Sequence, residues 1–286
     1  LVRSRGLGDV YKRQLVDCVI QGNIRNYGTG EVRFEAPQIT PESTATKPSE
    51  VYKPGATLDR TLEYGGKTVP IYRDRPLNVF SDVDFIWTGE ENENQRRLEY
   101  LGGEFRTRYG IDVSSFQGEI DWDAVADDNI DFAMVRVGFR GTGTGSLNTD
   151  KYYEQNIRGA MRAGLETGVY FFAQAVTVEE AIEEADYVIS LLDGLDINGP
   201  VAYDWEMHDS TYRVYGTSPE MATACAVAFC QRIKDAGYTP MVYGGTYVTY
   251  MKYDQGALAD YLSWYPEYKS EKSEKLCPTL VYHMDY

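Results

Sequence analysis

The fold is decided by GVYFFAQ at residues 168–174, VAYDWEM at residues 201–207 and PMVYGG at residues 240–245. Each run carries apolar residues at consecutive positions, as strands buried on both faces of a parallel sheet do. Four similar runs flank them: YGIDVSS at 109–115, FAMVRVGF at 132–139, LSWYPEY at 262–268 and LVYHMDY at 280–286. The chain therefore predicts seven strands of a mainly parallel sheet.

Amphipathic helical patterns separate these strands. One pattern begins at Thr177, where Thr177 and Glu180 match a capping box. Another begins at Ser218, has Pro219 at its first helical position and ends at Gly237. Repeated strand–helix units imply a parallel sheet, and seven covered strands favour a barrel over an open sheet. The glycine fingerprint of a dinucleotide-binding sheet is missing after the first strand.

The charge balance excludes several classes of function. The chain has 44 Asp and Glu against 28 Lys and Arg, for a net charge of −16. Such a surface repels phosphate backbones, so we expect no nucleic-acid partner. No run of 18 apolar residues occurs, so no transmembrane segment is predicted. Two His, and four Cys without a CxxC pair, argue against a metal site, and no cofactor is expected.

Composition divides the chain into four parts. Residues 1–14, LVRSRGLGDVYKRQ, look like the foreign peptides at the ends of translated assemblies, so we expect the native N-terminus and any secretion signal to lie outside this chain. Residues 15–58 are predicted to be a linker or stalk, because their stretch 37–58 is rich in Pro, Thr, Ser and Glu. Residues 59–106 form an extension of unknown role. The regular pattern places one barrel domain at 107–286.

Two carboxylates stand close together on a buried strand. In VAYDWEMHD, Asp204 and Glu206 are two positions apart and face the same side of the strand. On one face of a buried strand they would repel each other, and one would have the raised pKa that a general acid needs near neutral pH. The alternative is a strand end that emerges into solvent, where paired acids are harmless.

A third carboxylate, Asp112, lies on the first predicted strand, in RYGIDVSSFQGEIDWDAV at residues 108–125. The alternative interpretation of this segment is a helix-capping loop, since Asp121 before Trp122 would also open a helix. Functional residues of a barrel lie at the carboxyl ends of its strands. A barrel therefore predicts that Asp112 meets the two acids of the middle strand at one mouth.

These motifs carry a family resemblance. GIDVSSFQGEIDW, followed about 90 residues later by YDWE, resembles glycoside hydrolase family 25, the lysozymes of the Chalaropsis type. The resemblance covers residues 107–286 and includes FAMVRVGFRG, GVYFFA, MVYGG and SWYPEY. It implies an α/β fold, an irregular TIM-like (β/α) barrel with about eight strands and fewer helices. It also implies an N-acetylmuramidase, which cleaves the β-1,4 bond between N-acetylmuramic acid and N-acetylglucosamine.

The resemblance also assigns roles to the three acids. Glu206 matches the family's catalytic acid, Asp204 its partner, and Asp112 the aspartate of the first strand. The family's W-x-A-D-Y motif falls on residues 264–268, where Glu267 replaces the aspartate and a proline replaces the small residue.

The end of the chain departs from the family as well. The family's later W-Q-Y falls on Met284, Asp285 and Tyr286. Relatives continue through a further turn and a closing segment. We therefore expect the barrel to be truncated at its C-terminus.

Aromatic residues near the predicted strand ends are candidates for a sugar groove, because flat rings cover the apolar faces of sugars. Arg136, on the second strand, either pairs with the acid cluster or belongs to a structural ion pair. For each aromatic candidate the alternative is a place in the barrel core. The candidates are Tyr170, Phe172, Tyr243, Tyr247, Trp264 and Tyr268.

The resemblance favours a mechanism in which Glu206 protonates the glycosidic oxygen, the substrate's 2-acetamido group attacks, and Asp204 assists, with retention. In the alternative, Asp204 or Asp112 activates water, with inversion. The expected partner is the peptidoglycan glycan strand, and we expect an extracellular or cell-envelope monomer.

Two other functions remain open. A chitinase-like enzyme of glycoside hydrolase family 18 would need D-x-x-D-x-D-x-E, but Gly199 and Ala202 occupy its first two acid positions. A catalytically impaired glycan-binding barrel is kept open by Pro266 and Glu267.

Overall fold

The structure is a computed structural model that describes residues 24–26, 32–34, 45–89, 97–103, 105–269 and 273–286. It divides into two units, Leu1–Thr44 and Ala45–Tyr286. In the first unit, β1 (Ile24–Asn26) pairs antiparallel with β2 (Val32–Phe34). All the other helices and strands described below belong to the second unit. No helix among the described residues is long and apolar enough to cross a membrane.

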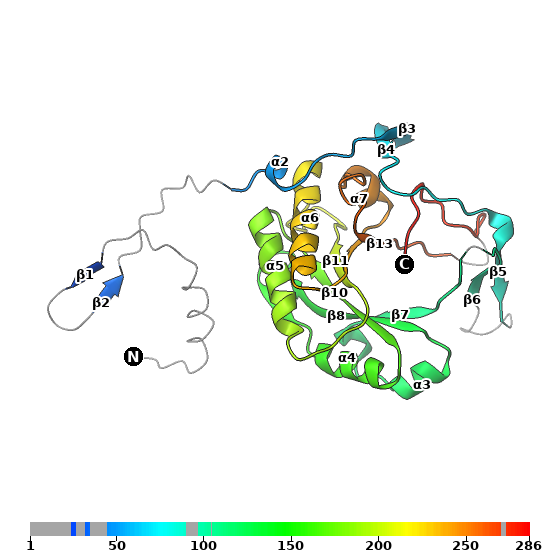
Figure 1. Cartoon of the computed structure of the whole chain (residues 1–286), viewed down its shortest axis with the longest axis horizontal. Coiled ribbons are helices and arrows are strands. Elements are labelled where there is room, and N and C mark those ends of the chain that lie inside the picture. The colour runs from blue at the N-terminus through cyan, green and yellow to red at the C-terminus, as the bar shows by residue number, and fades with distance from the viewer. Residues whose placement is uncertain (1–23, 27–31, 35–44, 90–96, 104, 270–272) are drawn as a thin grey trace. The chain divides into compact units, whose positions relative to one another are not determined.

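The second unit is built on a curled parallel sheet, in the order β13-β12-β11-β10-β8-β7, with β9 antiparallel on the edge of β8 (Figure 1). Its strands are β7 (Gly110–Val113), β8 (Phe132–Arg140), β9 (Leu147–Thr149), β10 (Glu166–Ala173), β11 (Val201–Trp205), β12 (Pro240–Tyr243) and β13 (Leu262–Trp264). The α-helices between these strands are α3 (Trp122–Asp127), α4 (Tyr153–Arg162), α5 (Val178–Leu191), α6 (Pro219–Asp235) and α7 (Thr246–Met251). The predicted α/β barrel class is confirmed. Six of the seven predicted strands are present.

The predicted strand at residues 280–286 is wrong. The segment forms only an isolated antiparallel bridge, between Leu77 and Tyr282. Its backbone hydrogen bonds go to two different neighbours. The N–H of His283 donates to the carbonyl of Pro76 in the extension at 3.0 Å, and the N–H of Asp285 donates to the carbonyl of Ser263 at 3.0 Å. Because its hydrogen bonds point to different neighbours, the segment lies beside β13 without forming a regular ladder.

Side chains on the two faces of the sheet form two separate cores. Phe171, Tyr203 and Trp205 are fully buried on the outer face, under the helices. Met134 and Met241 belong to a smaller cluster on the inner face. Successive residues of a strand point to opposite faces, so polar residues that alternate with the outer core must point into the barrel.

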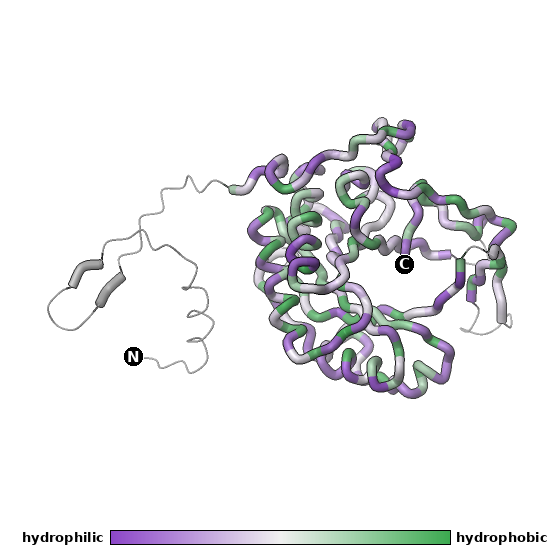
Figure 2. The backbone as a smooth tube through the Cα atoms, viewed as in Figure 1, coloured by the Kyte–Doolittle hydropathy of each residue, from purple (hydrophilic) through white to green (hydrophobic). Residues whose placement is uncertain are grey.

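The helix signals in the sequence are confirmed. The Oγ1 of Thr177 accepts a hydrogen bond from the N–H of Glu180 at 3.2 Å, which caps α5. Ser218 caps α6 in the same way, with Pro219 at the first helical position. Gly237 ends the second pattern in the left-handed region, with φ 90°. Figure 1 shows α5 and α6 side by side. In Figure 2 hydrophobic and hydrophilic residues alternate along both helices.

The residues before the barrel pack on it. A short helix, α2 (Pro48–Val51), contacts α6. The N–H of Gly55 donates to the Asp254 carboxylate at 3.0 Å. Two parts of the predicted linker, α2 and Gly55, therefore contact the barrel. Residues 37–44 lie outside the described residues, and a linker over 15–58 stays a prediction.

The extension contributes two hairpins to the same body. One pairs β3 (Leu58–Tyr64) with β4 (Lys67–Tyr72), and the other pairs β5 (Phe85–Thr88) with β6 (Arg97–Tyr100). Ile71 of β4 is fully buried, in a cluster with Tyr250 and Tyr282 of the barrel. The Arg75 guanidinium is also buried and donates to the carbonyls of Leu258 and Tyr261, each at 2.8 Å.

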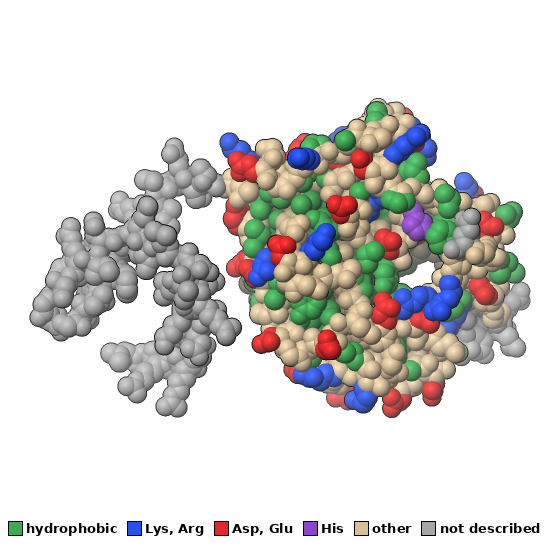
Figure 3. All heavy atoms as spheres, in the orientation of Figure 1, with side chains coloured by type: hydrophobic (Ala, Val, Ile, Leu, Met, Phe, Trp, Pro, Cys, Tyr) green, Lys and Arg blue, Asp and Glu red, His purple; other side chains and the backbone are tan. Residues whose placement is uncertain are grey.

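Acidic and basic side chains are interspersed over the face shown in Figure 3. On this face the net acidic charge is therefore not gathered into one single-sign patch. This face therefore shows no continuous patch of one charge sign that would bind a long charged polymer.

Candidate active site

A cavity of about 530 Å³ opens at the carboxyl ends of the strands. Its lining includes all three predicted acids, five of the six aromatic candidates, Arg136 and Glu267. Ser114, Phe116, Gln117, Tyr265 and Pro266 also line it, although the sequence analysis did not list them as site residues. Tyr247 does not line it and is an exposed residue. The lining is Asp112, Ser114, Phe116, Gln117, Arg136, Tyr170, Phe172, Asp204, Glu206, Tyr243, Trp264, Tyr265, Pro266, Glu267 and Tyr268.

Sheet register explains why the lining residues converge. Phe172 of β10 is aligned with Asp204 of β11, and Asp204 with Tyr243 of β12. Tyr243 is in turn aligned with Trp264 of β13. Aligned residues on neighbouring parallel strands point the same way, so these four side chains form one layer at the top of the barrel interior.

Asp204 is the buried acid of the site. It is 7% exposed, and its Oδ1 has no hydrogen-bond partner among the described residues. Burial raises the pKa of Asp204 well above its ordinary value, and the charges of Glu206 and Asp112 raise it further. The sequence predicted one raised pKa in the pair, as a general acid needs, but the raised pKa belongs to Asp204, which the family resemblance matches to the partner of the catalytic acid.

Asp112 is an exposed residue at the same mouth. Partial desolvation of its carboxyl at the cavity wall raises the pKa of Asp112, a backbone hydrogen bond opposes this, and the charge of Glu206 adds to the rise. The charges of the three acids therefore influence one another, which agrees with their predicted meeting at one mouth.

Glu206 presents its carboxylate to the cavity with a quarter of the side chain exposed. The Nε2 of His208 lies 3.0 Å from its Oε2. Burial raises the pKa of the Tyr243 hydroxyl, as do the nearby charges of Glu206 and Asp204 and a hydrogen bond with the Glu206 side chain. Sequence reasoning missed His208, although its position two residues after Glu206 was a signal.

Arg136 forms the structural ion pair that the sequence analysis considered. Its Nη2 lies 2.8 Å from Oδ2 of Asp150, whose side chain is completely buried. Burial alone would raise the pKa of Asp150, but hydrogen bonds from the backbone N–H groups of Ser115 and Tyr152, and from Arg136, lower it. Arg136 also opposes the rise in the pKa of Asp204, so its charge reaches the acid cluster.

Glu267 lies in the cavity wall, but its carboxylate is already bound. Lys269 donates to Oε1 at 2.8 Å, and Thr279 donates to both oxygens, at 2.9 Å from its N–H and 2.6 Å from its hydroxyl. Burial opposes ionisation, yet these hydrogen bonds lower the pKa of Glu267. Glu267 therefore shapes the wall as a fixed anion, and the 93% exposed Tyr268 lies at the rim.

A curled parallel α/β sheet with three carboxylates over a groove at its mouth is an arrangement that glycoside hydrolase barrels use. Residues 111–283 match the profile of glycosyl hydrolases family 25, and the chain belongs to this family. Among the described residues, no group of three or more His, Cys, Asp or Glu has the arrangement of a metal site.

Two curated relatives are lysozymes. The chain is 26% identical over 164 residues to the autolytic lysozyme of Clostridium acetobutylicum, covering 57% of this chain and 46% of that protein. It is 30% identical over 112 residues to lysozyme M1 of Streptomyces globisporus, covering 38% of this chain and 36% of that protein. The chain thus matches less than half the length of either relative.

A solved structure shares the fold. The modular autolysin LytC of Streptococcus pneumoniae superposes with a TM-score of 0.52 at 22% identity, covering 75% of this chain and 51% of that one. LytC has also been solved in complex with a synthetic peptidoglycan ligand. The family match thus makes the chain a lysozyme-family glycoside hydrolase, and LytC shares its irregular barrel fold.

Proposed function

We propose that this chain is an N-acetylmuramidase that hydrolyses the β-1,4 bond between N-acetylmuramic acid and N-acetylglucosamine in peptidoglycan. The observation that carries the proposal is the contrast between two acids on one strand. Asp204 is buried in the cavity wall, whereas a quarter of the Glu206 side chain is exposed in the cavity. Environments that separate two carboxyl groups in this way assign them different roles in a glycosidase.

Glu206 is the general acid of the proposed reaction. Its carboxyl group gives a proton to the glycosidic oxygen as the bond to the anomeric carbon breaks. Its ionised form then takes a proton from the incoming water. His208 and Tyr243 both interact with this carboxylate, so it has hydrogen-bonding neighbours in the site.

Asp204 assists the substrate's own nucleophile. The unpaired Oδ1 of Asp204 is a buried acceptor at the cavity wall, suited to the N–H of a 2-acetamido group. That hydrogen bond would orient the acetamido oxygen for attack on the anomeric carbon, with retention of configuration. The burial of Asp204 favours this over water activation by the same residue.

Inversion through Asp112 is the competing route, because Asp112 is exposed and accessible to water. The anomeric configuration of the first product, followed by proton NMR during cleavage of a soluble muropeptide, distinguishes the two routes. A β-anomer formed first supports substrate assistance, and an α-anomer formed first replaces it with water activation.

Peptidoglycan strands are the proposed partner, because the chain shares its family with lysozymes and its fold with LytC. Ring faces of Tyr170, Phe172 and Trp264 and the rim ring of Tyr268 would line the sugar path. Since this polymer lies outside the cytoplasmic membrane, we propose the cell envelope or the extracellular space as the place of action. The barrel at 107–286 is the proposed catalytic domain.

Purified peptidoglycan digestion tests the proposal. The new reducing ends should be N-acetylmuramic acid, and the variant Glu206→Gln should release none above background. New N-acetylglucosamine ends would contradict the assigned bond. Binding to peptidoglycan without cleavage by the parent protein would instead support the glycan-binding alternative, in which the tethered Glu267 marks a lost function.

A further inference from the structure

The backbone of Glu206 is held by a side chain from the neighbouring strand end. The register between β10 and β11 stops at the pair of Ala173 and Trp205, one residue before Glu206. Gln174, which is completely buried, donates from its side-chain Nε2 to the Glu206 carbonyl at 2.8 Å. This bond fixes Glu206 where the sheet ladder no longer does.

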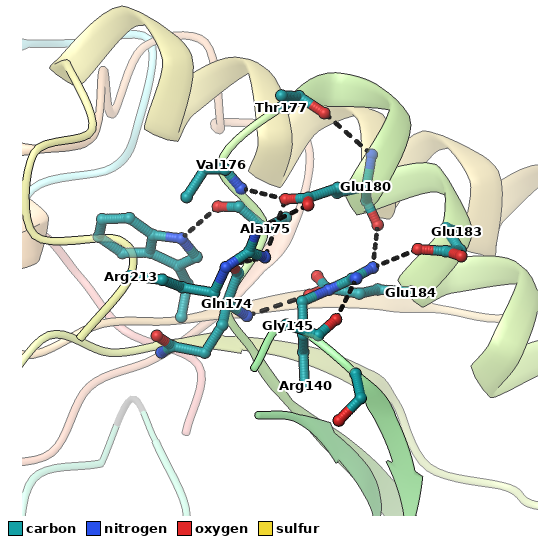
Figure 4. A network of polar contacts seen from close by, with 12 residues as sticks. Arg140, Gly145, Gln174, Ala175, Val176, Thr177, Glu180, Glu183, Glu184 and Arg213 are labelled. Atoms are coloured by element: carbon teal, nitrogen blue, oxygen red, sulfur yellow. Dashed lines mark hydrogen bonds and ion pairs between the residues drawn. The ribbon is translucent and has the colours of Figure 1, made fainter. Parts of the chain in front are cut away.

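Gln174 is itself anchored through both of its backbone groups (Figure 4). Its N–H donates to Oε1 of Glu184 at 3.0 Å, and its carbonyl accepts from Nη1 of Arg213 at 2.9 Å. Glu184 of α5 is completely buried and accepts from Nε of Arg140 at 2.7 Å. The strand end is therefore attached to α5 and to β8 by charged hydrogen bonds, which are stronger than neutral ones.

The loop after β11 is attached to the same helix. Both Nη atoms of Arg213 bond to the carboxylate of Glu180, at 3.0 and 2.7 Å. The indole Nε1 of Trp205 donates to the Ala175 carbonyl at 3.1 Å. Consequently the chain is tied down immediately before Glu206, at Glu206 and seven residues after it.

Buried ion pairs add little net stability over apolar packing, so stability does not explain such a network at this place. A general acid, in contrast, must lie within hydrogen-bond reach of the glycosidic oxygen, and displacement by about 1 Å costs about 100-fold in rate. We propose that Gln174 is a positioning residue for Glu206, held in place by Glu184 and Arg213. This inference rests on the proposed role of Glu206.

The first test replaces Gln174 with Met, which has a similar volume and no amide. Gln255 supplies a matched control, because it is also buried and its amide donates to the Thr249 carbonyl at 3.3 Å, outside the cavity lining. We expect Gln174→Met to lower kcat on a soluble muropeptide by about 10- to 100-fold, with KM changed by less than about 3-fold. Gln255→Met should keep the parent kcat at a similar or larger loss in Tm.

A second variant separates positioning from simple damage to the fold. In Gln174→Glu, a protonated carboxyl group can donate to the Glu206 carbonyl, whereas an ionised one repels it. Glu184 and Glu180 of α5, Arg140 of β8 and Arg213 face this position. We expect the kcat of Gln174→Glu relative to the parent to rise as pH falls, while the same ratio for Gln174→Met stays flat.

The outcomes distinguish the two proposals. If Glu206→Gln keeps the parent rate, the proposed function fails, whatever Gln174 does. If Glu206→Gln is inactive but Gln174→Met keeps the parent kcat, the positioning role alone is refuted. If Gln174→Met does not fold, the pH dependence of Gln174→Glu decides: a rising ratio supports the role, and a flat one overturns it.

Discussion

The imidazole of His208 lies 3.0 Å from the carboxylate of Glu206, so the two side chains share one hydrogen bond at the edge of the cavity. The two differ in exposure: the His208 side chain is 63% exposed, and that of Glu206 is 25% exposed. Exposed pairs of this kind contribute little energy because water competes for both partners.

This exposure gives the first prediction. His208→Gln should change kcat/KM on peptidoglycan by less than about 5-fold, since exposed pairs are worth at most about 1 kcal/mol. Tyr243→Phe, which removes a half-buried hydroxyl next to the same carboxylate, is the comparison variant and should cost more activity. A loss of 100-fold or more in His208→Gln would make His208 a participant in proton transfer.

Asp204→Asn should abolish most activity and yet stabilise the fold at pH 7. The folded-state pKa of Asp204 is raised, so its contribution to stability is full below its ordinary pKa and is lost as pH rises through the raised value. The amide carries no such pH-dependent loss. Relative to the parent, the variant should therefore gain about 0.5–2 kcal/mol of unfolding free energy at pH 7 and nothing at pH 3.

Urea titrations at the two pH values measure this difference. Asp112→Asn is the control, because the pKa of Asp112 is raised as well but its residue is exposed. We expect Asp112→Asn to gain less unfolding free energy at pH 7 than Asp204→Asn does. Equal stability of Asp204→Asn and the parent at both pH values would contradict the burial argument.

An activated aryl glycoside separates the roles of the two acids. Its leaving group departs without a proton, so Glu206→Gln should regain much of the parent rate, whereas Asp204→Asn should not. On peptidoglycan both variants should lose about 10²–10⁴-fold. Equal behaviour of the two variants on the aryl substrate would remove the distinction between acid and assistant.

Arg136→Met should destabilise the fold by about 3–5 kcal/mol, because it leaves the completely buried Asp150 without its cation. The folded-state pKa of Asp150 is lowered, so its stabilising contribution is present at neutral pH and is lost as pH falls through that value. The loss of unfolding free energy in Arg136→Met, relative to the parent, should therefore be smaller at pH 3 than at pH 7. Thermal melts at pH 7 and pH 3, with the double variant Arg136→Met/Asp150→Asn as control, measure it. A deficit that grows in acid would argue against the ion pair.

Sequence alone predicted the strands that are continuous apolar runs, and it predicted the caps at Thr177 and Ser218, because both signals are local. It failed at residues 280–286, where an apolar run carries the pattern of a strand but its backbone partners come from two elements. Periodicity reports which side chains are buried and not which backbone they meet.

The site was predictable to the level of residue types. The convergence of Asp112, Asp204 and Glu206 followed from strand ends and a closed sheet. The bond between Gln174 and Glu206 did not, because its partners are 32 residues apart and nothing local in either residue marks the other. The hydrogen bonds between Thr279 and Glu267 could not be predicted for the same reason, since Thr279 lies 12 residues away in a segment without regular structure.

The burial of Ile71 and Arg75 has a practical consequence for anyone who expresses this protein in pieces. Both residues precede the family match at 111–283, yet one fills an apolar cluster of the barrel and the other satisfies two of its carbonyls. A recombinant fragment cut at the family boundary would expose that cluster and leave those carbonyls without their donor, so it should aggregate. A fragment intended to fold should therefore begin before Ile71 and not at residue 111.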